Sequence, residues 1–276
     1  MKAWLWFLCW SLVAMILVTV IGKVLGVRLF DFSWFSLLFF TLPIVCLISH
    51  AIYTLGLGRS VLFIGLAMFV GWLGETLGLI GGMLFGGEYI YADGQVNIGL
   101  VPVIVICFWG VFVYTGYTMS NSLLLWLRKE KPSIRNKKPL LLLLLLILDG
   151  WFVVAIDLFM DPLQVEAGRW TWINGGAYFG VPLGNFVGWF VLTVVITGLF
   201  RVFEYFKLRD ESLIDNTVLI MPTTGYCALA AWFLVSALQV KMYYLAFCGS
   251  MFMFVNVSIC LVLFAYMRAK STRLPS

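Results

Sequence analysis

Four acidic residues lie within or beside long apolar stretches of this 276-residue chain, where carboxyl groups are energetically costly. Glu75 lies in one stretch, and Asp149 and Asp157 lie in another. Asp161 follows Asp157 by four residues, so both carboxyl groups project from one face of a helix. Two states are open for these acids: they are neutral because an apolar medium disfavours charge, or they border water or a cation. A neutral carboxylic acid in an apolar pocket could act as a proton donor.

The residues around the acids favour a pocket over simple contact with lipid. Glycines recur at every fourth position beside Glu75, from 74 to 86, and predict close packing against another helix. After Asp161, Pro162 is expected to end the helix, and the following segment is rich in aromatic residues that could stabilise a cation. The candidates are Trp170, Trp172, Tyr178 and Phe179, followed by the polar Asn185. For the two tryptophans, an interfacial aromatic belt is the alternative interpretation.

The composition places these acids in a membrane protein. Hydrophobic residues make up 63% of the chain and charged residues 11%, and the mean hydropathy is +1.03. Soluble domains carry about 25% charged residues, so the composition excludes a soluble enzyme, a disordered chain and a nucleic-acid-binding protein. Eight apolar stretches reach the length of about 20 residues that a membrane-spanning helix needs. They are 3–21, 34–55, 61–84, 98–127, 139–160, 185–205, 217–239 and 242–266.

The distribution of positive charge predicts the orientation of this eight-helix bundle. If the polar segments alternate between two sides, 14 of the 18 lysine and arginine residues fall on the side that holds both termini. By the positive-inside rule this side is cytoplasmic, and the basic segment 128–138 is a cytoplasmic loop. We therefore expect one all-α transmembrane domain over residues 1–276, in a multi-pass protein of the cell membrane. No lysine or arginine is expected at the depth of the acids.

Histidine and cysteine give little sign of metal chemistry. His50 is the one histidine, and the six cysteines lie in apolar stretches without a CxxC pair. We interpret the cysteines as small buried hydrophobic residues and expect no metal site. The role of His50 stays open. For Asp149, a hydrogen bond between helices, to a serine, threonine or asparagine, is the favoured role.

Two parts of the chain resemble a known family of membrane proteins. The first combines Asp157-Leu-Phe-Met-Asp-Pro162, Val165-Glu-Ala-Gly-Arg-Trp-Thr-Trp172 and Tyr178-Phe-Gly-Val-Pro-Leu-Gly-Asn-Phe-Val-Gly-Trp189. The second runs from Gly71-Trp-Leu-Gly-Glu75 through Gly82, Phe85, Gly86, Tyr89 and Tyr91 to Leu100-Val-Pro102 and Trp109, with a looser match at His50. These motifs resemble the carotenoid biosynthesis membrane proteins, which include the CruF-type carotenoid 1,2-hydratases and bisanhydrobacterioruberin hydratase. The motif-bearing core covers about residues 50–190.

The resemblance implies addition of water across the terminal isoprenoid double bond of an acyclic C40 or C50 carotenoid, giving a tertiary alcohol without an organic cofactor. From that chemistry, Glu75 or Asp157 is the expected proton donor, and the other, with Asp161 and Asn185, would orient or deprotonate the water. The expected walls of the substrate pocket are Trp170, Trp172, Tyr178, Phe179, Tyr89 and Trp109. The expected partners are the lipophilic carotenoid, membrane lipid and water, with other enzymes of the carotenoid pathway as further candidates.

Three other functions compete with this hypothesis. The spacing of Asp157 and Asp161 also matches the acidic motif that binds Mg²⁺-diphosphate in membrane prenyltransferases, although a second aspartate-rich motif is missing from the sequence. Intramembrane acids are also typical of proton-coupled carriers, but the chain shows no recognisable inverted repeat. A member of the same family with a changed reaction is the third alternative.

Overall fold

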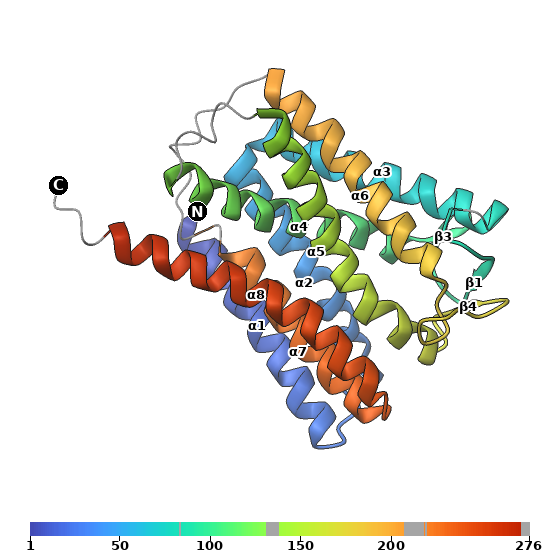
Figure 1. Ribbon diagram of the computed structural model, residues 1–276. Helices are drawn as coiled ribbons and strands as arrows, with labels where there is room; N and C mark the ends of the chain where they lie inside the picture. The colour runs from blue at the N-terminus through green and yellow to red at the C-terminus, as the bar shows by residue number, and fades with distance from the viewer. Residues whose placement is uncertain (83, 131–137, 207–217, 219, 272–276) are drawn as a thin grey trace.

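The computed structural model of the chain describes residues 1–82, 84–130, 138–206, 218 and 220–271. Within these residues, eight helices are long and apolar enough to cross a membrane, which confirms the predicted all-α multi-pass bundle (Figure 1). They are α1 (Lys2–Val24), α2 (Ser33–Leu55), α3 (Leu57–Gly81), α4 (Val103–Glu130), α5 (Lys138–Glu166), α6 (Leu183–Phe206), α7 (Met221–Gln239) and α8 (Tyr243–Ser271). A short 3₁₀ helix, η1 (Leu29–Asp31), lies between α1 and α2. The predicted loop 128–138 lies largely outside the described residues.

Two helix ends differ from the sequence prediction. Helix α4 begins at Val103 because residues 97–102 form a small hairpin, in which β2 (Asn97–Ile98) pairs with β3 (Val101–Pro102). Helix α5 continues through Pro162 to Glu166, so the prediction that this proline ends the helix is wrong. Proline lacks an N–H for the ladder and its ring crowds the carbonyl one turn earlier, yet the next turn still closes, since the Ala167 N–H donates to the Leu163 carbonyl at 3.0 Å. Asp161 is therefore a helical residue.

A two-stranded ribbon joins the loops that follow α3 and α5. Strand β1 (Tyr89–Tyr91) pairs antiparallel with β4 (Trp170–Trp172), and the register places Tyr89 opposite Trp172 and Tyr91 opposite Trp170. Side chains two residues apart in a strand share a face, so all four aromatic rings lie on one side of the ribbon. Figure 1 shows the ribbon capping one end of the bundle, while α1 begins and α8 ends on the opposite side.

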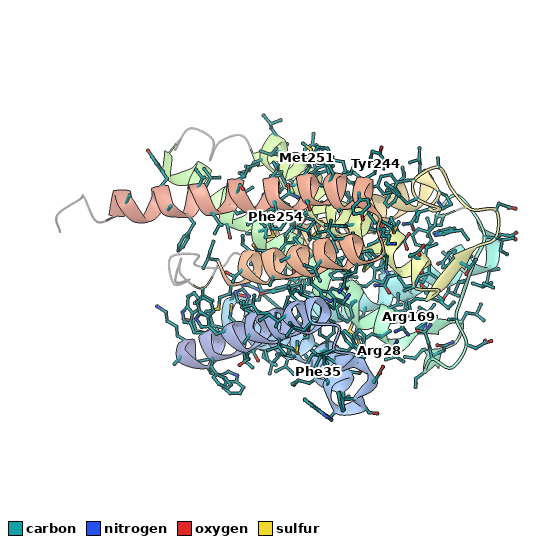
Figure 2. The ribbon with its side chains drawn as sticks, turned by 90° about the horizontal axis from the view of Figure 1, so that it is seen from below. Arg28, Phe35, Arg169, Tyr244, Met251 and Phe254 are labelled. Carbon is teal, nitrogen blue, oxygen red and sulfur yellow. The ribbon has the colours of Figure 1, made fainter. Side chains whose placement is uncertain are left out.

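The helices pack around α4 and α5. Helix α5 contacts α4, α6 and α8, while α4 also contacts α3, and α1 lies between α2 and α7. The glycines beside Glu75 allow the predicted close approach: a Cβ on Gly74 of α3 would collide with Leu192 of α6, and one on Gly86, in the loop after α3, would lie 2.7 Å from Gly184 Cα. The outer surface is apolar, as expected next to lipid, and Figure 2 shows Tyr244 and Met251 on the outer face of α8.

Candidate functional site

Three acids from two helices line one cavity next to the β1–β4 ribbon. Glu75 comes from α3, and Asp157 and Asp161 come from α5, while Asn185 of α6 lies between the two aspartates. All four side chains are buried, with at most 4% of their surface exposed. The cavity has a volume of about 160 Å³ and most of its wall is apolar, with contributions from α1, α2, α4 and α7 as well. The structure therefore brings together the four predicted catalytic residues.

Glu75 is held by three donors from the surrounding aromatic residues. Tyr89 Oη and Tyr91 Oη donate to Glu75 Oε2 at 2.5 and 2.8 Å, and Trp109 Nε1 donates to Oε1 at 3.0 Å. Burial, and after it the charge of Glu75, raises the pKa of both tyrosines well above the ordinary value. Both phenols therefore stay neutral and keep donating. Gly71, one turn before Glu75, leaves room for the Trp109 indole, since a Cβ there would collide with the ring.

The two aspartates share a single amide group. Asn185 Nδ2 donates to Asp157 Oδ2 at 2.7 Å and to Asp161 Oδ2 at 2.8 Å. Trp170 Nε1 donates to the other oxygen of Asp161. Asp157 Oδ1 is buried and accepts no hydrogen bond from any described residue, so it has capacity for a water molecule or a substrate atom. No three His, Cys, Asp or Glu side chains in the described part of the chain are grouped as metal ligands.

The aromatic residues predicted for the pocket divide into three groups. Tyr89, Trp170 and Trp172 line the cavity, and the Tyr89 and Trp172 rings lie 4.7 Å apart between centroids. Trp109 does not line the cavity; it donates to Glu75 and stacks on Trp189, which does line it, with a centroid separation of 3.8 Å. The remaining two, Tyr178 and Phe179, are not part of the cavity lining.

Tyr178 and Phe179 belong to a tight turn at the start of α6. The backbone N–H of Tyr178 donates to the Val181 carbonyl at 3.0 Å, and the reverse bond is 2.9 Å long. Phe179 occupies the left-handed region at φ 49° and is followed by Gly180 at φ 86°. The Tyr178 ring packs edge-on against Phe186, next to Asn185. The turn thus supports the helix start that carries Asn185.

Several residues of the cavity were not predicted. Tyr91, Gln164, Trp189 and Trp232 all contribute to its wall. Tyr91 had a signal in the sequence, because it lies two residues after Tyr89 in a strand and so shares its face. The apolar cavity residues of α1, α2 and α7, such as Leu12, had no such signal, because the sequence does not distinguish them from lipid-facing residues.

The expectation that no basic residue reaches the depth of the acids is wrong for Asp149. Arg201 of α6 donates to both oxygens of Asp149, from Nε at 2.8 Å and from Nη2 at 2.7 Å. Arg201 lies five residues before the end of α6, and its long side chain carries the guanidinium to α5. Ser120 also donates to Asp149, so the expected serine contact exists beside the ion pair. Neither residue lines the cavity, so we assign the pair a structural role.

Both ring nitrogens of His50 are also engaged. Its Nε2 lies 3.1 Å from the Val218 carbonyl, so this nitrogen carries the proton. Its Nδ1 then accepts from Tyr114 Oη at 2.8 Å, and Thr54 Oγ1 lies 2.8 Å from the same phenol. This group ties α2 to α4.

Comparison with known families identifies the chain. A sequence model of the family described as "carotenoid biosynthesis protein" matches residues 32–256, which cover α2 to the middle of α8 and include every acid of the cavity. The chain belongs to this family. It therefore has a role in carotenoid biosynthesis, as the resemblance implied. Comparisons with curated proteins and with solved structures found no match.

Membership of the carotenoid biosynthesis family gives the cavity a physical context. Carotenoids are long apolar molecules. The acids lie in a cavity whose wall is mostly apolar, inside a bundle of helices long and apolar enough to span a membrane. Helix α1 precedes the family match, yet Leu12, Met15 and Ile16 complete the cavity. The site therefore depends on a helix that carries none of the family's motifs.

Proposed function

We propose that this protein hydrates the terminal isoprenoid double bond of an acyclic carotenoid in the cell membrane, giving a tertiary alcohol. The observation that supports this most is Asp157 Oδ1, a buried carboxyl oxygen with no protein partner among the described residues, in a mostly apolar cavity. An alkene offers no hydrogen-bonding group, so the reaction must begin with a proton delivered directly from an acid.

The size of the cavity suits one end of such a substrate. Its volume is about 160 Å³, and an apolar protein cavity of about 150 Å³ accommodates benzene. A branched isoprenoid end group is of similar size. The rest of a carotenoid must then extend beyond the acids.

In this mechanism the aspartate pair supplies the proton. Asp157 and Asp161 both accept from one amide nitrogen of Asn185, so two buried carboxyl groups are neighbours, and their mutual repulsion favours a pair that retains one proton. Asp157 transfers this proton to the less substituted alkene carbon, which forms a C–H bond and leaves a cation at the tertiary carbon. A water oxygen then forms the C–O bond, and the proton it loses returns to the pair. The net change is the addition of one water molecule.

Glu75 stabilises the cation rather than donating the proton. Three donors converge on its two oxygens, an arrangement that favours a carboxylate. Its negative charge and the rings of Trp172 and Trp189, which also line the cavity, would offset the positive charge of the intermediate. Because these groups are already fixed by packing, little reorganisation is needed during the reaction.

The test is a pigment mass profile in a host that accumulates acyclic carotenoids. Wild-type protein should add the mass of one water per hydrated end, and Asp157→Asn and Glu75→Gln should each abolish this gain. Asp93→Asn and Glu88→Gln are matched controls, because both residues are exposed in the loop after α3, and they should retain full activity. Protein amounts and thermal unfolding should be compared for all variants.

Two results would contradict the proposal. Full hydration by folded Asp157→Asn protein would remove the aspartate as proton donor. Absence of any hydrated product from well-inserted wild-type protein, together with chelator-sensitive release of diphosphate, would favour the prenyltransferase alternative.

A further inference from the structure

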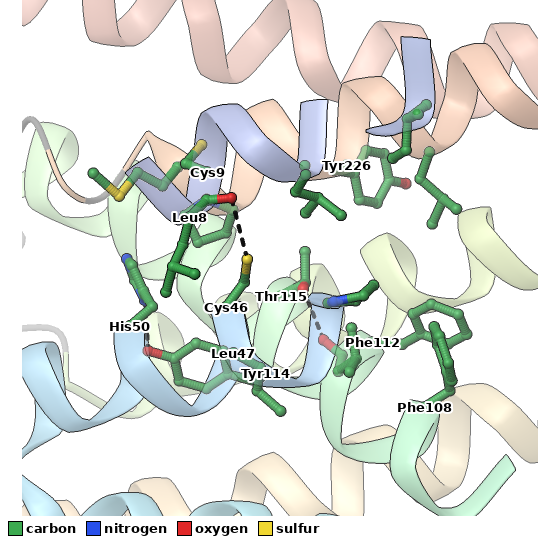
Figure 3. A pocket seen from close by; sticks show the side chains of 18 of the residues that line it. Leu8, Cys9, Cys46, Leu47, His50, Phe108, Phe112, Tyr114, Thr115 and Tyr226 are labelled. Atoms are coloured by element: carbon green, nitrogen blue, oxygen red, sulfur yellow. Dashed lines mark hydrogen bonds between the residues drawn. The ribbon is translucent and has the colours of Figure 1, made fainter. Parts of the chain in front are cut away.

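A second cavity lies directly beyond the one that holds the acids. Its volume is about 120 Å³, and Figure 3 shows His50 and Tyr114 toward one end and Phe108 and Phe112 toward the other. The two cavities share six wall residues. These are Leu12, Ile16, Pro43, Phe108, Phe112 and Leu229. Because six residues line both cavities, the two cavities are direct neighbours.

The two cavities, together called the channel below, follow one another along the helices of the bundle. On α2 the acid cavity is lined from Phe39 to Pro43, and the second cavity from Pro43 to His50. On α1, α4 and α7 as well, residues toward one end of the helix line the acid cavity and residues toward the other end line the second cavity. Phe39 and His50 are eleven residues apart, and a rise of 1.5 Å per residue gives a channel of roughly 17 Å along α2. Two cavities in line along the helices suit an elongated ligand.

The chemistry of the second cavity favours a hydrocarbon. Polar side chains in its wall already have hydrogen-bond partners in the protein. Cys46 Sγ contacts the Leu8 carbonyl, Thr115 Oγ1 donates to the Val111 carbonyl, and Tyr226 Oη donates to the Phe152 carbonyl. The two nitrogens of His50 are likewise engaged, as described above. The remaining wall is leucine, isoleucine, proline and aromatic rings. A polar ligand would therefore lose its hydration without gaining partners.

We propose that the second cavity binds the polyene chain of the same molecule whose end group meets the acids. The identity of that molecule as an acyclic carotenoid rests on the proposed function, whereas the continuity and apolar character of the channel do not. The junction between the cavities, at Leu12 and Phe112, distinguishes substrates by length. A long linear chain extends past it and is held in the second cavity, whereas a short alkene occupies the acid cavity alone.

Gly225 of α7 provides a way to block this junction. It lines the second cavity, and a Cβ added there would lie 3.6 Å from Leu12 Cδ2, in ordinary van der Waals contact. Gly225→Leu should therefore fill the passage without disturbing the acids. Gly198 of α6 is a matched control, since its Cβ would also lie 3.6 Å from a leucine Cδ2, that of Leu146, and it lines neither cavity.

Binding is measured without turnover, on the full chain in lipid nanodiscs, by quenching of tryptophan fluorescence. The two probes are an acyclic C40 polyene and a short acyclic terpene alkene with the same end group. Gly225→Leu should raise the Kd for the polyene by roughly tenfold or more and leave the Kd for the short alkene unchanged. Gly198→Leu should change neither. If the leucine variant does not fold, Gly225→Ala should shift the polyene Kd in the same direction by a smaller factor.

The outcomes separate this inference from the proposed hydration. Equal weakening of both probes by Gly225→Leu, or no effect on the polyene, would overturn the channel. A wild-type protein that binds the polyene with this pattern but forms no alcohol would refute the hydration and leave the channel in place. If the wild-type protein forms the alcohol but Gly225→Leu leaves the polyene affinity unchanged, the channel is refuted and the hydration stays in place.

Discussion

The ion pair between Asp149 and Arg201 allows a sharp test of which intramembrane acids are structural. Changing one partner alone leaves a buried charge without its counter-charge. Arg201→Met leaves Asp149 with Ser120 alone among the contacts described above. Asp149→Leu leaves the guanidinium with Ser120, Asn121 and the ring of Tyr117, whose centroid lies 4.5 Å from the Arg201 Cζ, and with the more distant charge of Glu204. The double variant removes both charges and fills the space with side chains of similar volume.

The geometry sets the expected magnitude. Asp149 is completely buried and Arg201 is 8% exposed, so solvent screens the pair little. Two charge-assisted hydrogen bonds join them, each contributing about 1.5–3 kcal/mol, and breaking a buried pair from one side costs about 3–5 kcal/mol. We expect each single variant to lower the free energy of unfolding by about 4 kcal/mol. The double variant should lie within about 1 kcal/mol of wild type, because replacing a whole buried pair is often close to neutral.

The assay is reversible denaturant unfolding in detergent micelles at fixed pH and ionic strength, combined with the pigment profile of the double variant. Because neither residue lines the acid cavity, a stable double variant should still form the alcohol. Single variants that lose less than about 1 kcal/mol, the range of an exposed pair, would refute the reasoning. Additive losses in the double variant would refute it as well. A stable but inactive double variant would show that Asp149 has a role beyond packing.

Two further predictions concern the donors that surround Glu75. Gly71→Ala should collide with the indole that donates to Glu75 and lower the hydration rate by roughly tenfold, whereas Gly65→Ala, whose new methyl meets nothing within 4 Å, should leave the pigment profile unchanged. The raised pKa of Tyr91 means that only the unfolded chain loses this proton above about pH 10, so the free energy of unfolding should fall as pH rises. In unfolding measurements through this range, Tyr91→Phe should make the fall shallower by up to about 1.4 kcal/mol per pH unit, while Tyr244→Phe, at an exposed tyrosine, should retain the wild-type slope.

The bundle itself could be predicted because the membrane limits the choices. Every backbone polar group in the hydrocarbon core must find an internal partner, so an apolar stretch of about 20 residues has to be a helix. The errors occur where local chemistry competes with hydropathy. Residues 98–102 carry no polar side chain but belong to a hairpin, and Pro162 lies in the last turns of α5, where one missing N–H is tolerated. The cytoplasmic side of the termini stays a prediction.

The site was predictable only in part, for a geometric reason. Helical spacing placed Asp157 and Asp161 on one face, and their cost in an apolar stretch marked them as functional. The partners of these acids lie far away in the sequence: Asn185 is 28 residues from Asp157, and Trp109 is 34 residues from Glu75. Spacing along a helix says which face a side chain occupies, but not which distant helix covers that face.

The amino-acid sequence by itself determined the membrane-spanning helices, the presence of costly acids and the family motifs, because each depends on composition or on spacing within one segment. Tertiary packing alone decided the rest. It divided the acids between a cavity and an ion pair, since Arg201 reaches Asp149 across 52 residues of sequence and no cavity acid has this partner among the bonds described here. It also built the channel from apolar side chains of α1, α2, α4 and α7, which acquire a role only where four helices leave a space between them.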